Sequence, residues 1–259
     1  MNVVVTSFSP DGYEKYGRNF ISSFMRYWDW PLVVFHENSE PDMKGPTYID
    51  LLKDQDLLDF LRYYDTMPAA HGIAGMKDGK PVADYRLQAV RFARKVFALT
   101  TLPLEKVDWW VWIDADTETT SKIDRRFVDA ACPQKGLISY LGRKDWDHSE
   151  CGFVAYRVGH PVPLSFLRDF RRAYTTGEIF KFPQWHDSYI FDRIMEMYAP
   201  WKPFFVNLSE GVPGNHVWPH TILGEYMVHN KGGAKETSKD TIRKIVGRNA
   251  DALRRLADK

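Results

Sequence analysis

The sequence predicts an α/β fold, in which a single Rossmann-like domain has a central, mostly parallel sheet flanked by helices. Short β-branched and aromatic runs alternate with amphipathic segments along the chain of 259 residues. The first units follow the order strand, helix, strand, which favours a parallel sheet with a right-handed crossover. No linker, internal repeat or low-complexity segment divides the chain, so we expect one domain over residues 1–259.

The N-terminal quarter carries the first of these units. Val3 to Val5 begin a strand that ends in the turn-forming run Ser9-Pro10-Asp11-Gly12. The next segment is expected to be a helix, and residues 32–36 make the second strand. The apolar stripe of that helix recurs at spacings of three or four, at Tyr16, Phe20, Phe24 and Tyr27. No G-x-G-x-x-G follows the first strand, which weakens a nicotinamide or flavin interpretation.

A cationic helix is expected before the middle of the chain. A short helix around residues 57–61 and a loop over 67–75 come first, and the loop either connects elements or covers a ligand. Residues 83–99 then make the clearest helix of the chain. Its four cations are Arg86, Arg91, Arg94 and Lys95. Such cations are usually solvated, but some of these could meet a phosphate or the acidic strand end that follows.

The second half continues the alternation of elements. Helices are expected over 123–131, 163–175 and 190–198, and strands over 137–140, 149–156, 204–206 and 226–229. A last amphipathic helix, at about 238–258, is expected to dock on the body of the domain. The glycine at 152 lies inside a strand pattern, which indicates either a bulge or the close approach of another group.

The composition narrows the class of protein. A hydrophobic content of 44% with 27% charged residues is ordinary for a globular protein. The net charge of +1 argues against a dedicated polyanion-binding surface. Two cysteines imply no disulfide framework, and neither a signal peptide nor an apolar run of membrane-spanning length is present. We therefore expect a cytoplasmic protein with no membrane span.

An aromatic and β-branched run, Trp109 to Ile113, leads directly into Asp114-Ala115-Asp116. Such a run between charged residues is typical of a buried central strand. Because side chains alternate along an extended chain, the two aspartates can point to the same side. Two carboxylates at the carboxyl end of a strand attract a divalent metal. The alternative is that they only terminate the strand, with Asp116 capping the next turn.

Four short segments that could carry chemistry follow one another along the chain. They are Asp114-Ala115-Asp116, Glu150-Cys151-Gly152-Phe153, His186-Asp187-Ser188-Tyr189 and the seven residues from His229 to Lys235. In this order the sequence resembles the GT-A glycosyltransferases, in particular glycogenin-like families with a D-x-D after a central strand and a late H-x-x-G-x-x-K. His229, Gly232 and Lys235 match that last spacing. The resemblance spans nearly the whole chain and implies a GT-A-type fold.

The resemblance also implies an activity and a set of residues. The chain would be a metal-dependent glycosyltransferase that moves a sugar from a nucleoside-diphosphate sugar, a UDP-sugar first, to an acceptor hydroxyl. Mn²⁺, or alternatively Mg²⁺, would be held by Asp114, Asp116 and His229, with Asp114 also able to reach the ribose. Oxygen ligands with one imidazole suit Mn²⁺. The remaining nucleotide contacts would be Thr6 and Ser7 beside the base and ribose, Arg91 or Lys95, and the phosphate-side pair Gly232 and Lys235.

Two acids are candidates for the sugar and acceptor side of the site. Asp187 is the first choice and Glu150 the second for the acid that deprotonates the acceptor in an inverting enzyme. Each has a competing structural role, Asp187 as a helix cap and Glu150 as a buried hydrogen-bonding acid. Glycogenin-like chains have F-N-x-G and D-Q-D segments at these two places, so the departure leaves the sugar contacts and the stereochemistry open.

The acceptor and two competing functions stay open. A glycan, a lipid-linked sugar, a protein side chain or a modified nucleobase could each accept the sugar. A sugar-nucleotide or glycan-binding module could keep the same fold without turnover. A phosphatase of the haloacid-dehalogenase type also uses D-x-D at a strand end, but that signature needs Thr or Val where this chain has Glu118, and it sits on the first strand.

Overall fold

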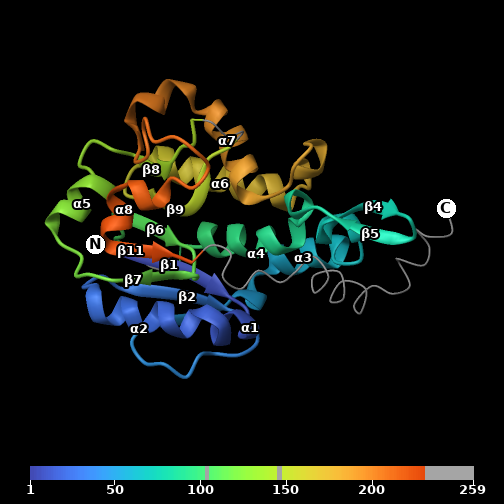
Figure 1. Cartoon of the computed structure of the whole chain (residues 1–259), viewed down its shortest axis with the longest axis horizontal. Helices are drawn as coiled ribbons and strands as arrows, with labels where there is room; N and C mark the ends of the chain where they lie inside the picture. Colours follow the sequence, from blue (N-terminus) through green and yellow to red (C-terminus); the bar gives the residue numbers. More distant parts are fainter. Residues whose placement is uncertain (103–104, 145–147, 231–259) are drawn as a thin grey trace.

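The computed structural model describes residues 1–102, 105–144 and 148–230. These residues form a central seven-stranded sheet with the order β10-β8-β9-β6-β1-β2-β3 (Figure 1). In chain order, its strands are β1 (Asn2–Phe8), β2 (Leu32–His36), β3 (Thr47–Asp50), β6 (Trp109–Ile113), β8 (Ile138–Leu141), β9 (Glu150–Tyr156) and β10 (Phe205–Asn207). The predicted α/β class with a mostly parallel sheet is confirmed.

One strand of this sheet runs against the others. β1 pairs in parallel with β2 and β6, β2 with β3, and β8 with β10, whereas β9 is antiparallel to both β6 and β8. The first residues of β9 therefore lie at the edge of the sheet where β1 and β6 end. This reversal, which the sequence pattern did not indicate, brings Glu150 and Gly152 beside the end of β6.

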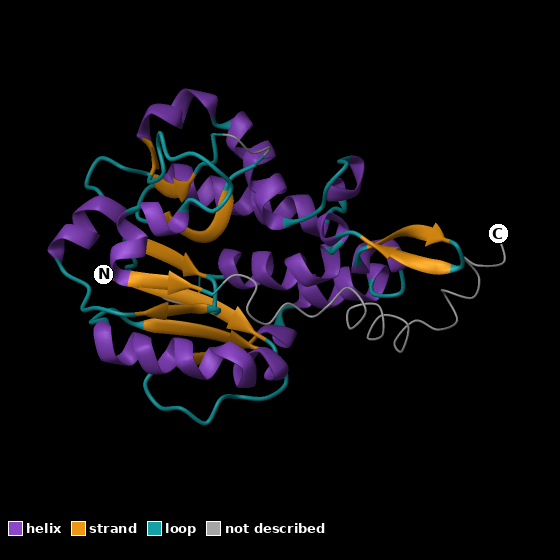
Figure 2. Cartoon of the chain, in the orientation of Figure 1, coloured by secondary structure: helices purple, strands orange, loops and turns teal. Residues whose placement is uncertain are grey.

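Both faces of the sheet are covered by helices, which gives three layers (Figures 1 and 2). Side chains alternate along each strand, so that Val3 and Val5 of β1 join one core and Val4 joins the other. The first core is completed by α3 (Gln55–Tyr64), α4 (Ala89–Thr100), α6 (Pro161–Thr175) and α7 (Asp187–Met197). The second is completed by α2 (Arg18–Tyr27), α5 (Arg125–Ala131) and α8 (Ile222–Tyr226). Burial on both faces explains why the central strands are continuously apolar.

Two small antiparallel pairs stand apart from the main sheet. β7 (Thr117–Thr119) follows β6 closely and pairs with β11 (Met227–His229), with His229 opposite Thr117. β4 (Ile73–Lys77) and β5 (Lys80–Ala83) form a hairpin that projects from the body of the molecule (Figures 1 and 2). Its turn residues Asp78 and Gly79 have φ values of 51° and 72°, as a tight two-residue hairpin turn requires.

The predicted helix over 83–99 is wrong at its start, because α4 begins at Ala89. Residues 80–83 belong to the hairpin, and the Asp84 carboxylate accepts a hydrogen bond from the backbone N–H of Arg86, which starts a 3₁₀ turn over Tyr85–Leu87 instead. The predicted loop over 67–75 is likewise structured, as a 3₁₀ turn over Pro68–His71 followed by β4.

The helix predicted after β1 is broken into three pieces. A short α1 (Pro10–Gly12) leads into a π-helical turn over Tyr13–Gly17, and α2 follows. The remaining 3₁₀ turns span Leu51–Lys53, Glu178–Lys181, Ala199–Phe204 and Trp218–His220. The predicted C-terminal helix at 238–258 lies outside the described residues, as do Gly232 and Lys235. In the described part of the chain, no helix has both the length and the apolar character needed to cross a membrane.

Candidate metal centre

Asp114 and Asp116 lie where the chain leaves β6 and turns into β7. The N–H of Asp114 donates to the carbonyl of Gly152 on the antiparallel neighbour β9, and the N–H of Thr117 donates back to the carbonyl of Asp114. The carbonyl of Asp116 accepts a hydrogen bond from Asn230, just after β11. Asp116 therefore lies in the turn between β6 and β7, and no helix begins there.

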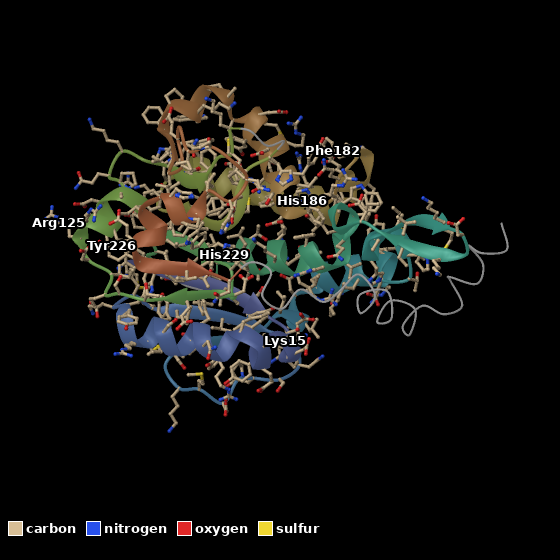
Figure 3. The ribbon with its side chains drawn as sticks, viewed as in Figure 1. Lys15, Arg125, Phe182, His186, Tyr226 and His229 are labelled. Atoms are coloured by element: carbon tan, nitrogen blue, oxygen red, sulfur yellow. The ribbon has the colours of Figure 1, made fainter. Side chains whose placement is uncertain are left out.

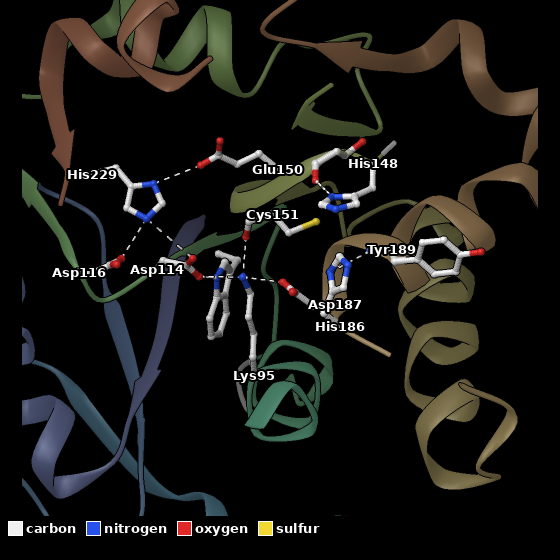
Figure 4. Close-up of polar contacts among 12 residues, drawn as sticks. Lys95, Asp114, Asp116, His148, Glu150, Cys151, His186, Asp187, Tyr189 and His229 are labelled. Atoms are coloured by element: carbon white, nitrogen blue, oxygen red, sulfur yellow. Dashed lines mark hydrogen bonds and ion pairs between the residues drawn. The ribbon is translucent and has the colours of Figure 1, made fainter. Parts of the chain in front are cut away.

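His229 reaches the two aspartates because β11 pairs with β7. Its Nε2 lies 3.0 Å from Asp116 Oδ1 and 4.0 Å from Asp114 Oδ2, and its side chain is only 1% exposed. One ligand atom from each of the three residues falls within 4.8 Å of the others. Residues from the middle and the end of the described chain thus converge on one point (Figure 4).

The chemistry of this trio fits a divalent cation. Asp116 Oδ1 is buried, and apart from its 3.0 Å contact with His229 Nε2 it makes no hydrogen bond to a residue that the structure describes. Burial opposes a charge on His229, but the nearby carboxylates of Asp116 and Glu150 outweigh it and raise the pKa of the imidazole to about 9. The surroundings therefore favour positive charge at this point. Two carboxylates and an imidazole form a donor set that Mn²⁺ accepts.

Lys95 supplies a fixed positive charge beside the trio. It projects from the middle of α4, and its Nζ lies 2.7 Å from Asp114 Oδ1, 2.8 Å from Asp187 Oδ2 and 2.7 Å from the carbonyl oxygen of Cys151. Burial alone would lower the pKa of Lys95, but the two carboxylates outweigh burial and raise it. The Trp112 indole N–H also donates to Asp114 Oδ1, at 2.6 Å. One oxygen of Asp114 is thus tied to Lys95 and Trp112, and the other faces His229.

Asp187 opens α7, and its side chain is only 5% exposed. The cap of this helix is His186, whose Nδ1 accepts a hydrogen bond from the backbone N–H of Tyr189 at 3.3 Å. The alternative interpretation of Asp187 as the capping side chain is therefore wrong. Its carboxylate is free to turn toward Lys95 and the end of β6, as Figure 4 shows.

Glu150 lies at the first position of β9, with a side chain that is 2% exposed. Its Oε1 is 3.3 Å from Nδ1 of His229, on the opposite side of the imidazole ring from the two aspartates (Figure 4). Lys95, Asp187 and Glu150 thus come together around the trio. Glu150 contacts His229, whereas Asp187 contacts Lys95.

Two of the residues predicted on the nucleotide side, Thr6 and Ser7, lie near the end of β1. Ser7 is partly exposed there, whereas Thr6 is fully buried, and its hydroxyl makes no hydrogen bond within the described chain. Arg91 is exposed on α4, one turn before Lys95, and its guanidinium donates to Gln88 Oε1 at 3.3 Å. The roles given to these side chains remain predictions.

Sequence reasoning missed Tyr16 as a neighbour of the site. Burial raises the pKa of Tyr16, the carboxylates of Asp116 and Asp114 raise it further, and the guanidinium of Arg91 lowers it. The partly exposed side chain is therefore near enough to feel the charges of Arg91 and of the two aspartates. Its place in the apolar stripe of a predicted helix made it look like a core residue. The π-helical turn is the only local signal, and it is visible in the structure alone.

Two histidines beside Asp187 were also left unassigned. The rings of His148 and His186 lie 4.5 Å apart, and Arg143 Nη2 lies 2.7 Å from His148 Nδ1. Burial lowers the pKa of His186 to about 4, so this imidazole is neutral near pH 7. Figure 3 shows His186 and His229 on the same central part of the molecule. Nothing in their sequence spacing indicated this, because they lie on different elements.

Comparisons with known proteins show a similarity of fold alone. No protein-family model matches the sequence, and no curated protein matches it. The solved structures that resemble it include mouse xyloside xylosyltransferase 1 in its apo form, at 11% identity and a TM-score of 0.47 over 80% of this chain and 85% of that one. A glycosyltransferase involved in glycosylation of the major capsid of PBCV-1 shows 14% identity and a TM-score of 0.46 over 97% and 98%.

A third similar structure is the apo form of the glycosyltransferase GlyE from Streptococcus pneumoniae TIGR4. It shows 9% identity and a TM-score of 0.44 over 81% of this chain and 45% of that one. Likenesses at these scores are too distant to carry an argument about activity. The function proposed below therefore rests on the side chains of the site.

Proposed function

We propose that this chain is a single-domain, metal-dependent glycosyltransferase that moves a sugar from a nucleoside-diphosphate sugar to an acceptor hydroxyl. The observation that carries the proposal is the convergence of Asp114, Asp116 and His229 at the edge where β1 and β6 end. In α/β sheets, this edge is where ligands bind. The donor set suits Mn²⁺ better than Mg²⁺, because Mg²⁺ prefers oxygen ligands alone.

The bound metal would act as a Lewis acid that stabilises the charge of the departing nucleoside diphosphate. Asp114, Asp116 and His229 would hold it. Ser7, Tyr16 and Arg91 would contact the nucleoside, with Thr6 supporting Ser7 from the buried side. We retain for Gly232 and Lys235 the phosphate contacts that the family resemblance implies.

The pair Lys95 and Asp187 would face the transferred sugar. Lys95 lies between two carboxylates, and its ion pair with Asp187 holds opposite charges side by side in a nearly buried position. Fixed, preoriented charges of this kind stabilise a transition state without reorganisation. Asp187 is our candidate for the acid nearest to the donor sugar and the acceptor hydroxyl.

The decisive experiment measures nucleoside-diphosphate release from a panel of nucleotide sugars, UDP-sugars first, with Mn²⁺ and then with a chelator. We expect slow hydrolysis of one donor by the wild-type protein, abolished by the chelator and by Asp116→Asn. The substitution keeps the shape of the side chain and removes the charge that binds metal. Circular dichroism and a thermal melt verify that the variant is folded.

Each other outcome would decide between alternatives. Tight nucleotide binding by Asp116→Asn in the presence of chelator would sink the metal-dependent mechanism. Metal-dependent binding by the wild-type protein with no release from any donor, even with candidate acceptors present, would favour a non-catalytic sugar-nucleotide-binding module.

A further inference from the structure

Glu150 lies against the imidazole of His229, away from any open part of the site. Its Oε1 is 3.3 Å from Nδ1, and both side chains are almost completely buried. The other ring nitrogen, Nε2, points to Asp116 Oδ1 at 3.0 Å. A side chain in this position contacts the back of a metal-binding imidazole, and it is poorly placed to deprotonate an acceptor hydroxyl.

Gly152 makes room for the same imidazole. A Cβ atom at this position would lie 2.7 Å from Cε1 and 3.2 Å from Nδ1 of His229, and 3.4 Å from Oε1 of Glu150. The φ angle of Gly152 lies outside the left-handed region, so its backbone conformation would accept alanine. The requirement for glycine therefore comes from the close approach of the ring.

Trp218 packs against another side of the same imidazole. Its ring centroid is 4.7 Å from that of His229, and its indole N–H donates to the carbonyl of Met227 at 3.3 Å. The imidazole thus lies between the Glu150 carboxylate, the backbone of Gly152 and the Trp218 indole. The first two residues belong to β9, and Trp218 lies in the chain before β11. We call Glu150, Gly152 and Trp218 the imidazole seat.

With a metal on Nε2 the imidazole would be neutral, and the seat then determines that its one proton lies on Nδ1. A neutral imidazole has one N–H, and a carboxylate can only accept, so Glu150 stabilises the tautomer with the proton on Nδ1. The lone pair of Nε2 then faces Asp114 and Asp116. A carboxylate behind a metal-binding histidine fixes its orientation and increases its basicity as a ligand.

We propose that Glu150 is a positioning residue for a divalent metal site, acting through His229, and that Gly152 provides the space this arrangement needs. The inference rests on the proposed metal-dependent function. It assigns Glu150 to metal binding instead of to the acceptor, and so leaves Asp187 as the acid on the sugar side.

The test measures Mn²⁺ affinity in the presence of UDP and without any sugar donor or acceptor, by calorimetry and by the electron paramagnetic resonance of free Mn²⁺. Glu150→Gln should weaken Mn²⁺ binding by about 10- to 100-fold. Its amide can donate to Nδ1 and so place the proton on Nε2. Glu118→Gln is the matched control, because Glu118 lies exposed on β7, beside the site but outside the seat, and its affinity should stay within about twofold of wild type.

A double-substitution cycle separates positioning from a general structural effect. If Glu150 acts only through its histidine, Glu150→Gln should add less than about twofold to the loss already caused by His229→Ala. Gly152→Ala is the independent variant, in case Glu150→Gln does not fold. The added methyl displaces the imidazole, so it should also weaken Mn²⁺ binding, again without any contact to a sugar.

The outcomes distinguish this inference from the proposed function. Wild-type Mn²⁺ affinity in both Glu150→Gln and Gly152→Ala, with donor turnover lost in Glu150→Gln, would overturn the inference and return Glu150 to the acceptor side. Additive losses in the double substitution would overturn it as well. If the wild-type protein itself bound no Mn²⁺ in the presence of UDP, the proposed function would fail, and the inference with it.

Discussion

Two mostly buried cations, Lys95 on α4 and Arg171 beside it, each pair with two aspartates, but they engage different numbers of carboxylate oxygens. In the Lys95 cluster, formed by Lys95, Asp114 and Asp187, the ammonium contacts one oxygen of each carboxylate. The second oxygen of Asp114 faces His229 at 4.0 Å. The Lys95 cluster is therefore in contact with the remaining metal-ligand candidates, His229 and Asp116.

The Arg171 cluster, formed by Arg171, Asp54 and Asp56, has a similar composition but lies apart from the metal-ligand candidates. Arg171 on α6 donates to both oxygens of Asp54, at 2.6 and 2.8 Å, and to Asp56 at 2.9 Å. Its guanidinium also lies 4.7 Å from the ring centroid of Phe97. Asp54 in addition caps α3 by accepting from the N–H of Leu57. A surface pocket of about 390 Å³ lies beside Arg171, and the guanidinium already engages both oxygens of Asp54.

The difference teaches that buried ion pairs do not by themselves mark a functional site. A bidentate arginine engages both oxygens of Asp54 and ties α3 to α6. A lysine is a point charge that neutralises carboxylates while leaving half of their oxygens available. The following experiments test this contrast, beginning with the largest expected effect.

Replacing Lys95 by methionine should have the largest effect on stability. The nearly buried Asp187 and the partly exposed Asp114 would lose their shared cation, and breaking a buried pair costs about 3–5 kcal/mol. We expect that loss in the free energy of unfolding, measured with denaturant in the presence of chelator. Mn²⁺ should restore part of it, because the metal binds Asp114 and supplies positive charge. A loss below about 1 kcal/mol would contradict the view that Lys95 is required for charge balance.

The pH dependence of stability should report the buried histidine beside this cluster. Burial lowers the pKa of His186 to about 4, from about 6.5 in the unfolded chain. Between these two values the unfolded state takes up a proton that the folded state does not, so stability should fall as pH decreases from 6.5 towards 4. The full effect is on the order of 3 kcal/mol, and unfolding curves across this range measure it.

Asparagine is the matched control for this titration, because it can still cap α7 but cannot be protonated. His186→Asn should therefore flatten the slope, leaving the smaller contribution of His148, whose pKa burial also lowers. The ring of His186 faces charged groups of both signs, which are Asp187, His148, Arg143 and Arg86. An unchanged slope in the variant would assign the acid sensitivity to other groups.

Replacing Arg171 by methionine should have a smaller effect and no functional consequence. The variant loses charge-assisted hydrogen bonds to Asp54 and Asp56, which should cost about 2 kcal/mol, because the partly exposed aspartates can be rehydrated. Thermal and denaturant unfolding measure this loss. Mn²⁺-dependent nucleotide release should stay within about twofold of wild type. A large fall in Mn²⁺ affinity would refute the distinction between the two clusters.

Much of the fold could be predicted because it depends on local patterns. The apolar run Trp109 to Ile113 is a fully buried central strand, and the strands at Val3 and Leu32 pair in parallel as expected. The start of α4 was misplaced for a local reason of another kind. Asp84 accepts a hydrogen bond from the next turn and competes with the helix, an effect that apolar periodicity does not reveal.

The sequence allowed the residues of the candidate site to be predicted better than the role of each residue. The types and order of Asp114, Asp116 and His229 pointed to a metal through a family resemblance, and the structure brings their ligand atoms together. Glu150 and Asp187 looked alike in the sequence, as two acids each near a glycine or a helix start. Only their partners separate them, since one contacts an imidazole and the other an ammonium.

The sequence by itself determined the α/β class, the central strand and the residue types available for a metal site, because these follow from side-chain periodicity and composition. The tertiary structure decided the reversed direction of β9, the pairing of β11 with β7, and the placement of Glu150, Gly152 and Tyr16. Those features depend on contacts between residues far apart in the chain. No local pattern encodes such contacts, because their free energy is gained only when the whole sheet and its helices pack together.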